Sequence, residues 1–329
     1  MSPLPHSTAS RLPLAVETGL ARVEVRLAEE LASREAGLEA ITTHLVQAGG
    51  KRIRPTVVLL IYHAAAADGP GPRPDDAVEA AVALELIHSA TLLHDDIIDG
   101  GETRRGRPSA LRTYGLADTL VAGDFLFSRA FALCARFEAE IVRWAAEACV
   151  ALTEGEIMQG RFRHDPEVTV EAYLEIIERK TASLFAAGAR SAARLAGAPA
   201  AIVEAMASCG RHVGLAFQMS DDLLDVEGHS AVTGKPRGID LRDGNPSLPI
   251  VLALRHDPEL ARLFARRQPS PADVEAGLRS IRGTGVLAAV SERARGHVAA
   301  AVAEIGRLPP SACRTTLEAL ASDLVDRGS

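Results

Sequence analysis

The chain has 329 residues, and 47% of them are hydrophobic, which is enough apolar material for a sizeable core and argues against global disorder. The formal net charge of −7 argues against a nucleic-acid-binding protein, because such proteins usually carry a basic surplus. The four cysteines, Cys134, Cys149, Cys209 and Cys313, form no CxxC pair, so we expect buried free thiols in a reducing, cytoplasmic setting.

The N-terminal segment 1–13 predicts a flexible tail, and it lacks the charged start and apolar stretch of a signal peptide. The longest uncharged stretch, 55–67, is too short for a bilayer, which takes about 20 apolar residues. We therefore expect no transmembrane segment, while peripheral contact with a membrane stays open. From Leu14 onward apolar residues recur at three- and four-residue steps, and strand signals are nearly absent. The sequence predicts one all-α domain over 14–329.

Turn-rich segments divide the predicted helices, at 68–76, 100–108, 228–249 and 267–273. The helix predicted over 76–99 is apolar on nearly every face, so we expect it to be central and buried. It nevertheless ends in three aspartates, which oppose the helix dipole and are costly to bury unless cations arrive. Such a break of local rules indicates a functional site.

Two segments of the form DDxxD, "DDIID" and "DDLLD", supply six carboxylates at helix ends: Asp95, Asp96, Asp99, Asp221, Asp222 and Asp225. In each segment the first and last aspartates are four residues apart and share one helix face. Carboxylate oxygens are the protein ligands that Mg²⁺ prefers, together with water and substrate phosphates. Without cations so many carboxylates would repel one another, and we therefore predict a magnesium-diphosphate site.

Basic residues cluster in "GGKRIRP", "RRGRP", "RKT" and "GKPRG", which contain Lys51, Arg52, Arg54, Arg104, Arg105, Arg107, Lys180 and Lys235. Arginine binds phosphate oxygens bidentately, and lysine acts as a point charge. Together with the aspartates they predict sites for two diphosphates, one held through metal and one by side chains alone. His88 lies two turns before Asp95 on its face, and Gln218 lies one turn before Asp221. Either could contact a phosphate or be an ordinary structural residue, and the same holds for Glu156 and Gln159.

The segments "GGKRIRP", "IHSATLLHDDIIDGGETRRGRP", "ERKTASLF", "FQMSDDLLD" and "GKPRGIDLRDG" resemble, in order, those of the trans-isoprenyl diphosphate synthases, or polyprenyl synthetases. They span residues 49–244, and the helical context covers nearly the whole chain. The resemblance implies the isoprenoid synthase fold, a helical bundle around a deep central cavity, usually as a homodimer. It also implies condensation of isopentenyl diphosphate with an allylic diphosphate primer, with a cluster of three Mg²⁺ ions.

The resemblance implies roles for individual residues. Direct metal ligands would be Asp95, Asp99 and Asp221, while Asp96, Asp222 and Asp225 would act directly or through water. The allylic diphosphate would be held by Arg104, Lys180 and Lys235, with Thr181 and Gln218 beside it. Isopentenyl diphosphate would be held by Lys51, Arg54, His88 and Arg105. The sequence departs from the family pattern at Gly100 and Gly101, where an acidic residue is common, and at Asn245, where many members carry lysine.

Chain length is predicted from the segment before the first aspartate motif. Ala90 and Thr91 are small where short-chain members often place an aromatic plug, and "IHSATLLHDD" resembles long-chain synthases. Phe127 or Phe131 could form the floor of the product tunnel, or both could be ordinary core residues. We expect a heptaprenyl or longer product, with geranylgeranyl diphosphate as the alternative.

Two other functions remain as alternatives. A class I terpene cyclase generally keeps one aspartate-rich motif and has no need of the second diphosphate site, whereas both are present here. A non-catalytic partner subunit tends to lose the aspartate motifs. A catalytic subunit that requires a small partner stays open.

Overall fold

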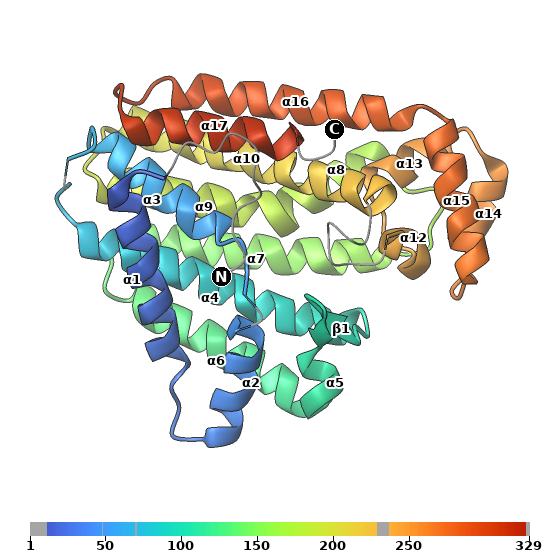
Figure 1. Ribbon diagram of the computed structural model, residues 1–329, viewed down its shortest axis with the longest axis horizontal. Coiled ribbons are helices and arrows are strands. Elements are labelled where there is room, and N and C mark those ends of the chain that lie inside the picture. The colour runs from blue at the N-terminus through green and yellow to red at the C-terminus, as the bar shows by residue number, and fades with distance from the viewer. Residues whose placement is uncertain (1–11, 48, 70, 229–236, 327–329) are drawn as a thin grey trace. The chain divides into compact units, whose positions relative to one another are not determined.

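The computed structural model describes residues 12–47, 49–69, 71–228 and 237–326 (Figure 1). Its first half contains α1 Leu14–Leu31, α2 Ala36–Gln47, α3 Ile53–Ala65, α4 Pro74–Ile98, β1 Thr103–Arg104, β2 Arg107–Pro108, α5 Ala110–Tyr114, α6 Leu116–Cys134 and α7 Ala139–Arg161. Its second half contains α8 Val170–Ile177, the π-helix η1 Glu178–Ala182, α9 Ser183–Leu195, α10 Ala200–Glu227, α12 Ile239–Asp243, α13 Leu248–Leu254, α14 Pro258–Phe264, α15 Pro271–Gly283, α16 Val286–Ile305 and α17 Ala312–Asp326. The all-α prediction is confirmed.

The chain divides into two compact units. Unit 1 comprises 1–146, 187–207 and 305–319, and unit 2 comprises 147–186, 208–304 and 320–329. The predicted single domain over 14–329 stays a prediction. The predicted tail falls almost entirely on residues 1–11, which lie outside the described residues.

Unit 1 is built around α4, which packs along α6 and also contacts α3 and α1. Every residue from Ala77 to Ile87 is buried, so the prediction of a central, buried helix is confirmed. Pro74 occupies the first turn, where its missing N–H costs nothing, and Asp99 caps the other end. Among the described residues α4 alone is long and apolar enough to cross a bilayer, but 72% of its most apolar window is buried, as in a core helix.

The predicted turn at 100–108 contains a small hairpin in which Thr103 pairs with Pro108 and Arg104 with Arg107. Arg105 and Gly106 form its tip with φ of 52° and 75°. A tight two-residue hairpin turn requires this left-handed pair. The hairpin folds the basic segment back toward the end of α4.

Unit 2 has its own core, with Tyr173, Leu248 and Phe264 among its fully buried members. The predicted polar loop at 228–249 contains α12 and the start of α13, and residues 229–236 of it lie outside the described residues. Ser270 and Asp273 form a capping box that starts α15, within the segment predicted to open the final section. The four cysteines are free thiols, as predicted, and three of them are buried.

Candidate active site

The three carboxylates of the first aspartate motif have different surroundings. Asp95 is half-buried and Asp99 is exposed, whereas Asp96 is only 2% exposed. Nε and Nη2 of Arg104 both lie 2.8 Å from Oδ1 of Asp96. Burial raises the pKa of Asp96, and the Arg104 guanidinium opposes that shift. Asp96 therefore fixes the basic hairpin to the helix end, while its buried Oδ2 has no hydrogen-bond partner among the described residues.

Gly101 approaches this carboxylate closely. A Cβ atom at Gly101 would lie 3.2 Å from Oδ1 of Asp96. An acidic side chain there would bring a second negative charge against a carboxylate that is already buried. This crowding is a physical reason for the glycine, at a position where the resemblance implied an acidic residue.

The basic segments "GGKRIRP" and "RRGRP" lie against each other in unit 1. A Cβ atom at Gly50 would lie 3.1 and 3.2 Å from the terminal nitrogens of Arg105. Arg52 has a structural role, because it donates to Glu24 at 2.6 Å and to Glu85 at 2.8 Å, and its side chain is 11% exposed. The sequence shows Arg52 only as one member of a basic cluster, because its partners Glu24 and Glu85 lie 28 and 33 residues away.

His88 lies among these cations. Burial, followed by the charges of Arg54, Arg105, Arg104 and Arg52, holds the pKa of His88 well below its ordinary value. The imidazole is therefore neutral at physiological pH. Concentrated positive charge beside a neutral hydrogen-bonding ring is suited to an anion such as a diphosphate.

The second aspartate motif, in unit 2, repeats the contrast between exposed and buried carboxylates. Asp221 is exposed, Asp222 is 3% exposed, and Asp225 is half-buried. Asp225 accepts from the N–H groups of Ile239 and Asp240 at 3.0 and 3.2 Å, so it caps the start of α12. Lys235, predicted to bind the allylic diphosphate, lies outside the described residues.

Asp222 accepts three hydrogen bonds. The Tyr173 hydroxyl donates to it at 2.6 Å, the Leu248 N–H at 2.9 Å and the Gln218 amide at 3.0 Å. Burial raises the pKa of Asp222 to about 6, and these donors oppose the rise. The oxygen of the Gln218 amide in turn accepts from the Thr181 hydroxyl at 2.9 Å. The sequence does not predict that Thr181 pairs with Gln218 or that Tyr173 pairs with Asp222. The signal that the sequence offers for Tyr173 is its position two turns before Lys180.

Lys180 and Thr181 belong to the π-helix η1, an irregularity that often marks functional sites. Two glycines permit the approach of neighbouring helices. A Cβ atom at Gly155 of α7 would lie 2.6 Å from the backbone N of Lys180, and one at Gly214 of α10 would lie 2.6 Å from Cα of Ala182. The Lys180 ammonium pairs with Glu156, one of the residues that the sequence left open.

Asn245, which stands where a lysine was expected, is 8% exposed. Its side-chain oxygen accepts from Nε of Arg163 at 3.0 Å. Its backbone N–H donates to the carbonyl of Asp240 at 2.8 Å. In this structure Asn245 therefore stabilises the segment between α12 and α13.

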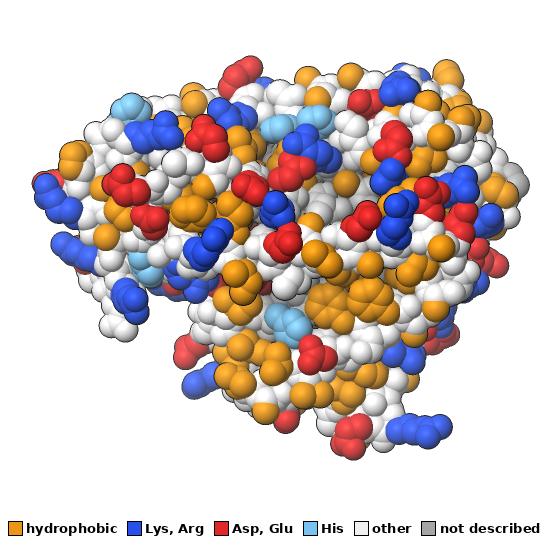
Figure 2. All heavy atoms as spheres, turned by 180° about the vertical axis from the view of Figure 1, so that it is seen from behind, with side chains coloured by type: hydrophobic (Ala, Val, Ile, Leu, Met, Phe, Trp, Pro, Cys, Tyr) orange, Lys and Arg blue, Asp and Glu red, His pale blue; other side chains and the backbone are white. Residues whose placement is uncertain are grey.

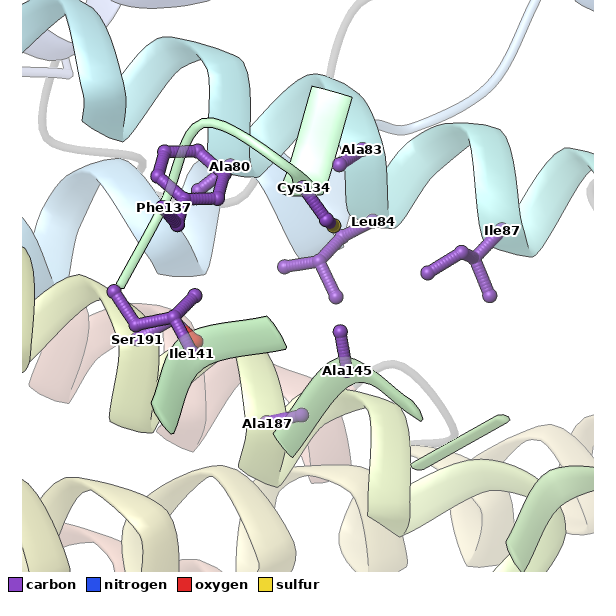
Figure 3. Close-up of a pocket in the computed structure, with 10 residues that line it drawn as sticks. All are labelled: Ala80, Ala83, Leu84, Ile87, Cys134, Phe137, Ile141, Ala145, Ala187 and Ser191. Atoms are coloured by element: carbon purple, nitrogen blue, oxygen red, sulfur yellow. The ribbon is translucent and has the colours of Figure 1, made fainter. Parts of the chain in front are cut away.

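Unit 1 contains an apolar cavity of about 20 Å³ beside α4 (Figure 3). Its lining residues are Ala80, Ala83, Leu84, Ile87, Cys134, Phe137, Ile141, Ala145, Ala187 and Ser191. Leu84 and Ile87 lie 11 and 8 residues before Asp95, or about 16 and 12 Å along the helix. Eleven residues are close to three full turns, so Leu84 is on the Asp95 face of α4. The cavity thus lies on the path that a chain would follow from Asp95 along this helix.

The predicted chain-length residues relate differently to this cavity. Thr91 is half-buried one turn before Asp95, and Ala90 is fully buried. Phe127 is half-buried, with its ring 5.9 Å from that of His94, and Phe131 is 40% exposed. The aromatic residue that lines the cavity is Phe137, which sequence reasoning missed.

Comparison with known proteins places the chain in one family. The family model described as polyprenyl synthetase matches residues 35–281. The nonaprenyl diphosphate synthase of Mycobacterium tuberculosis is 35% identical over 95% of this chain and 93% of its own length. The geranylgeranyl diphosphate synthase of Methanosarcina mazei is 34% identical over 90% and 91%. A crystal structure of a Caulobacter crescentus polyprenyl synthase, complexed with calcium and isoprenyl diphosphate, matches with a TM-score of 0.91 and 36% identity over 99% and 100% of the two chains. The fold is that of the isoprenoid synthases, as predicted.

Proposed function

Because the chain belongs to the polyprenyl synthetase family, we propose that it condenses isopentenyl diphosphate with an allylic diphosphate to build an all-trans polyprenyl diphosphate. The enzyme is a prenyltransferase of the polyprenyl diphosphate synthase class. The observation that carries the proposal is on α4. This one helix presents two carboxylates, Asp95 and Asp99, at its end, and the neutral His88 lies two turns before Asp95, near arginines. An acidic and a basic group of side chains, one for each of the proposed diphosphates, thus lie along the same helix.

The two aspartate motifs, at the ends of α4 and α10, are suited to Mg²⁺. Asp95, Asp99 and Asp221 present carboxylate oxygens at the less buried positions of the two motifs, and Asp96 contributes a buried oxygen that has no hydrogen-bond partner in the described part of the chain. The calcium in the Caulobacter crescentus relative also supports a divalent metal. We propose Asp95, Asp99 and Asp221 as ligands in a cluster of three ions. Bound magnesium would stabilise the negative charge that develops on the departing diphosphate.

The cations divide between the two substrates. We assign the allylic diphosphate to Arg104, Lys180 and Lys235, and isopentenyl diphosphate to Lys51, Arg54, His88 and Arg105. Arg104 and Lys180 are paired with Asp96 and Glu156, which keeps their charged groups in place before substrate arrives. An arriving diphosphate can share these cations, because arginine presents five donors and lysine three.

The reaction breaks the bond between the allylic carbon and its diphosphate oxygen. The isopentenyl double bond then attacks the allylic cation, and loss of a proton completes the new isoprene unit. Arg104 and Lys180 would stabilise the leaving diphosphate, and the departed diphosphate is the proposed acceptor of the proton. Exclusion of water from the site would keep the cation from being trapped before the double bond attacks.

We propose a long-chain product, heptaprenyl or longer, because small residues rather than an aromatic plug occupy Ala90 and Thr91. Geranylgeranyl diphosphate is the second candidate, and the cavity favours it. Phe137 lines the cavity together with Leu84, which lies about three turns before Asp95, and each turn of about 5.4 Å matches roughly one isoprene unit. The relatives include both product classes at nearly equal identity. Replacement of Phe137 with Ala should lengthen the product if this cavity limits the chain.

We further propose a cytoplasmic homodimer, with a small partner subunit as the alternative. Support for the homodimer comes from α6, which exposes Leu116, Leu120, Val121 and Phe131 at 40% or more. One face of the chain shows groups of exposed hydrophobic side chains in its lower half (Figure 2). Size-exclusion chromatography with light scattering would measure the mass of the assembly.

A diphosphate-release assay tests the function. Purified protein with Mg²⁺ and an allylic diphosphate should release diphosphate only when isopentenyl diphosphate is added, and chelation of the metal should stop the release. Rapid release from the allylic substrate alone would instead identify a terpene cyclase.

A further inference from the structure

The buried carboxylate of Asp222 connects three segments of unit 2. Its Oδ2 accepts from Tyr173 of α8 and from the N–H of Leu248 at the start of α13, and its Oδ1 accepts from Gln218 of α10. Three donors satisfy a carboxylate that is almost removed from water, which makes the burial of its charge tolerable. Asp222 differs in this from its exposed neighbour Asp221.

The network continues into the π-helix that carries Lys180. Gln218 accepts from Thr181 with the other end of its amide, so Thr181 and Asp222 are joined through one side chain. Tyr173 and Thr181 stand eight residues apart on the continuous segment α8–η1. This segment is therefore tied to α10 at two points, and both ties lead to Asp222.

We propose that Tyr173 is a positioning residue, which through Asp222 holds the second aspartate motif in register with the segment that carries Lys180. Asp222 is then an internal anchor rather than a metal ligand. This inference rests on the proposed function and adds to it a residue that would contact neither substrate nor metal.

The geometry also indicates what the loss of the hydroxyl would do. Tyr173 is 1% exposed and its ring belongs to the core of unit 2, so Tyr173→Phe keeps the packing and removes one donor from Asp222. Asp222 can then rotate toward its two remaining donors. The adjacent Asp221 and the Gln218–Thr181 link would lose their fixed orientation. Removal of a hydrogen bond to a metal ligand typically lowers metal affinity about 10- to 100-fold. Because Tyr173 acts on the proposed ligand Asp221 through Asp222, we expect an effect at the lower end of this range.

Tyr62→Phe is a matched control from unit 1. Tyr62 is also fully buried, and its hydroxyl accepts from the N–H of Arg73 at 3.0 Å. Both variants remove a buried tyrosine hydroxyl that makes a hydrogen bond, so both should lower the unfolding midpoint to a similar extent. Only Tyr173→Phe should affect the second aspartate motif.

The test measures Mn²⁺ binding in the presence of inorganic diphosphate by electron paramagnetic resonance, with the unfolding midpoint and steady-state kinetics of each variant. We expect Tyr173→Phe to bind Mn²⁺ about 10-fold more weakly than wild type, and Tyr62→Phe to bind it normally. Wild-type Mn²⁺ affinity in folded Tyr173→Phe would overturn the inference. If the wild type itself binds no Mn²⁺, the proposed function fails instead.

Two further variants keep the inference testable. If Tyr173→Phe does not fold, Gln218→Met removes a different donor from Asp222, and the same loss of Mn²⁺ affinity is expected. Where both Tyr173→Phe and Thr181→Val fold, their combined effect on Mn²⁺ affinity should be smaller than the sum of the single effects, because both act through Asp222. Additive effects would mean that Tyr173 and Thr181 act independently and would contradict the network.

Discussion

Gly155 determines how closely α7 approaches the π-helix, and Gly155→Ala should separate them. The added Cβ would lie 2.6 Å from the backbone N of Lys180 and 2.9 Å from Cβ of Arg179. Ordinary contacts between such atoms are about 3.5–4.0 Å, so the backbone of η1 must move by about 1 Å. Overpacking of this kind costs about 1–3 kcal/mol, against a gain of about 0.5–1 kcal/mol from replacing a helical glycine.

The displaced residue, Lys180, is one of the three that we assign to the allylic diphosphate. A shift of about 1 Å in a positioned group can lower the rate about 100-fold, so we expect kcat/KM for the allylic substrate to fall 10- to 100-fold. The assay compares initial rates over a range of allylic diphosphate concentrations, with thermal unfolding of each variant.

Gly160→Ala supplies the control on the same helix. Among the described residues, nothing would lie within 4 Å of a Cβ at Gly160, so this variant should be at least as stable as wild type and equally active. If Gly155→Ala matches Gly160→Ala in both kcat/KM and unfolding midpoint, the claim that Gly155 positions Lys180 is wrong.

Four further predictions concern single sites. Asp95→Ala or Asp221→Ala should lower turnover by orders of magnitude in Mg²⁺ buffer while the circular dichroism spectrum stays helical, and near-normal activity would contradict the metal assignment. Lys51→Ala should raise KM for isopentenyl diphosphate more than KM for the allylic primer, by about 10- to 100-fold for the loss of one charge-assisted contact worth about 1.5–3 kcal/mol, and equal effects would contradict the division of substrates. Ala90→Phe should shorten the product, as judged by reversed-phase chromatography, and an unchanged product distribution in an active variant would exclude a tunnel past Ala90. The pKa of His88 is held well below its ordinary value in the folded protein, so as the pH falls below about 6.5 the unfolded chain takes up a proton at His88 before the folded protein does, and the free energy of unfolding decreases. His88→Gln should remove up to about 1.4 kcal/mol per pH unit of this decrease, as measured by denaturant titrations at pH 5 and 7.

Local features of the chain were predictable from its sequence. The end of α4 at the aspartates followed from helical periodicity and from the glycines beyond it, and the predicted helix over 76–99 became Pro74–Ile98. The burial of this helix followed from apolar residues on nearly every face. The end of the helix and its burial both depend on residues that are neighbours in sequence, which is why the sequence pattern predicts them.

The division of labour within each motif was not predictable. Asp96 and Asp222 look equivalent to their neighbours in sequence, and only packing places them inside, against Arg104 and Tyr173. Gly155 matters because of a helix that follows about 25 residues later. Such roles depend on which residues of other segments pack against a side chain, and the periodicity of one helix does not contain that information.

The most direct test of the central claim is the mass of the product made by the purified chain. Protein incubated with Mg²⁺, isopentenyl diphosphate and farnesyl diphosphate should yield linear polyprenyl diphosphates that differ by one five-carbon unit, as detected by liquid chromatography with mass spectrometry. We expect such a series, ending at a defined longest product. Cyclic hydrocarbons, or farnesyl diphosphate returned unchanged by a folded protein, would contradict it.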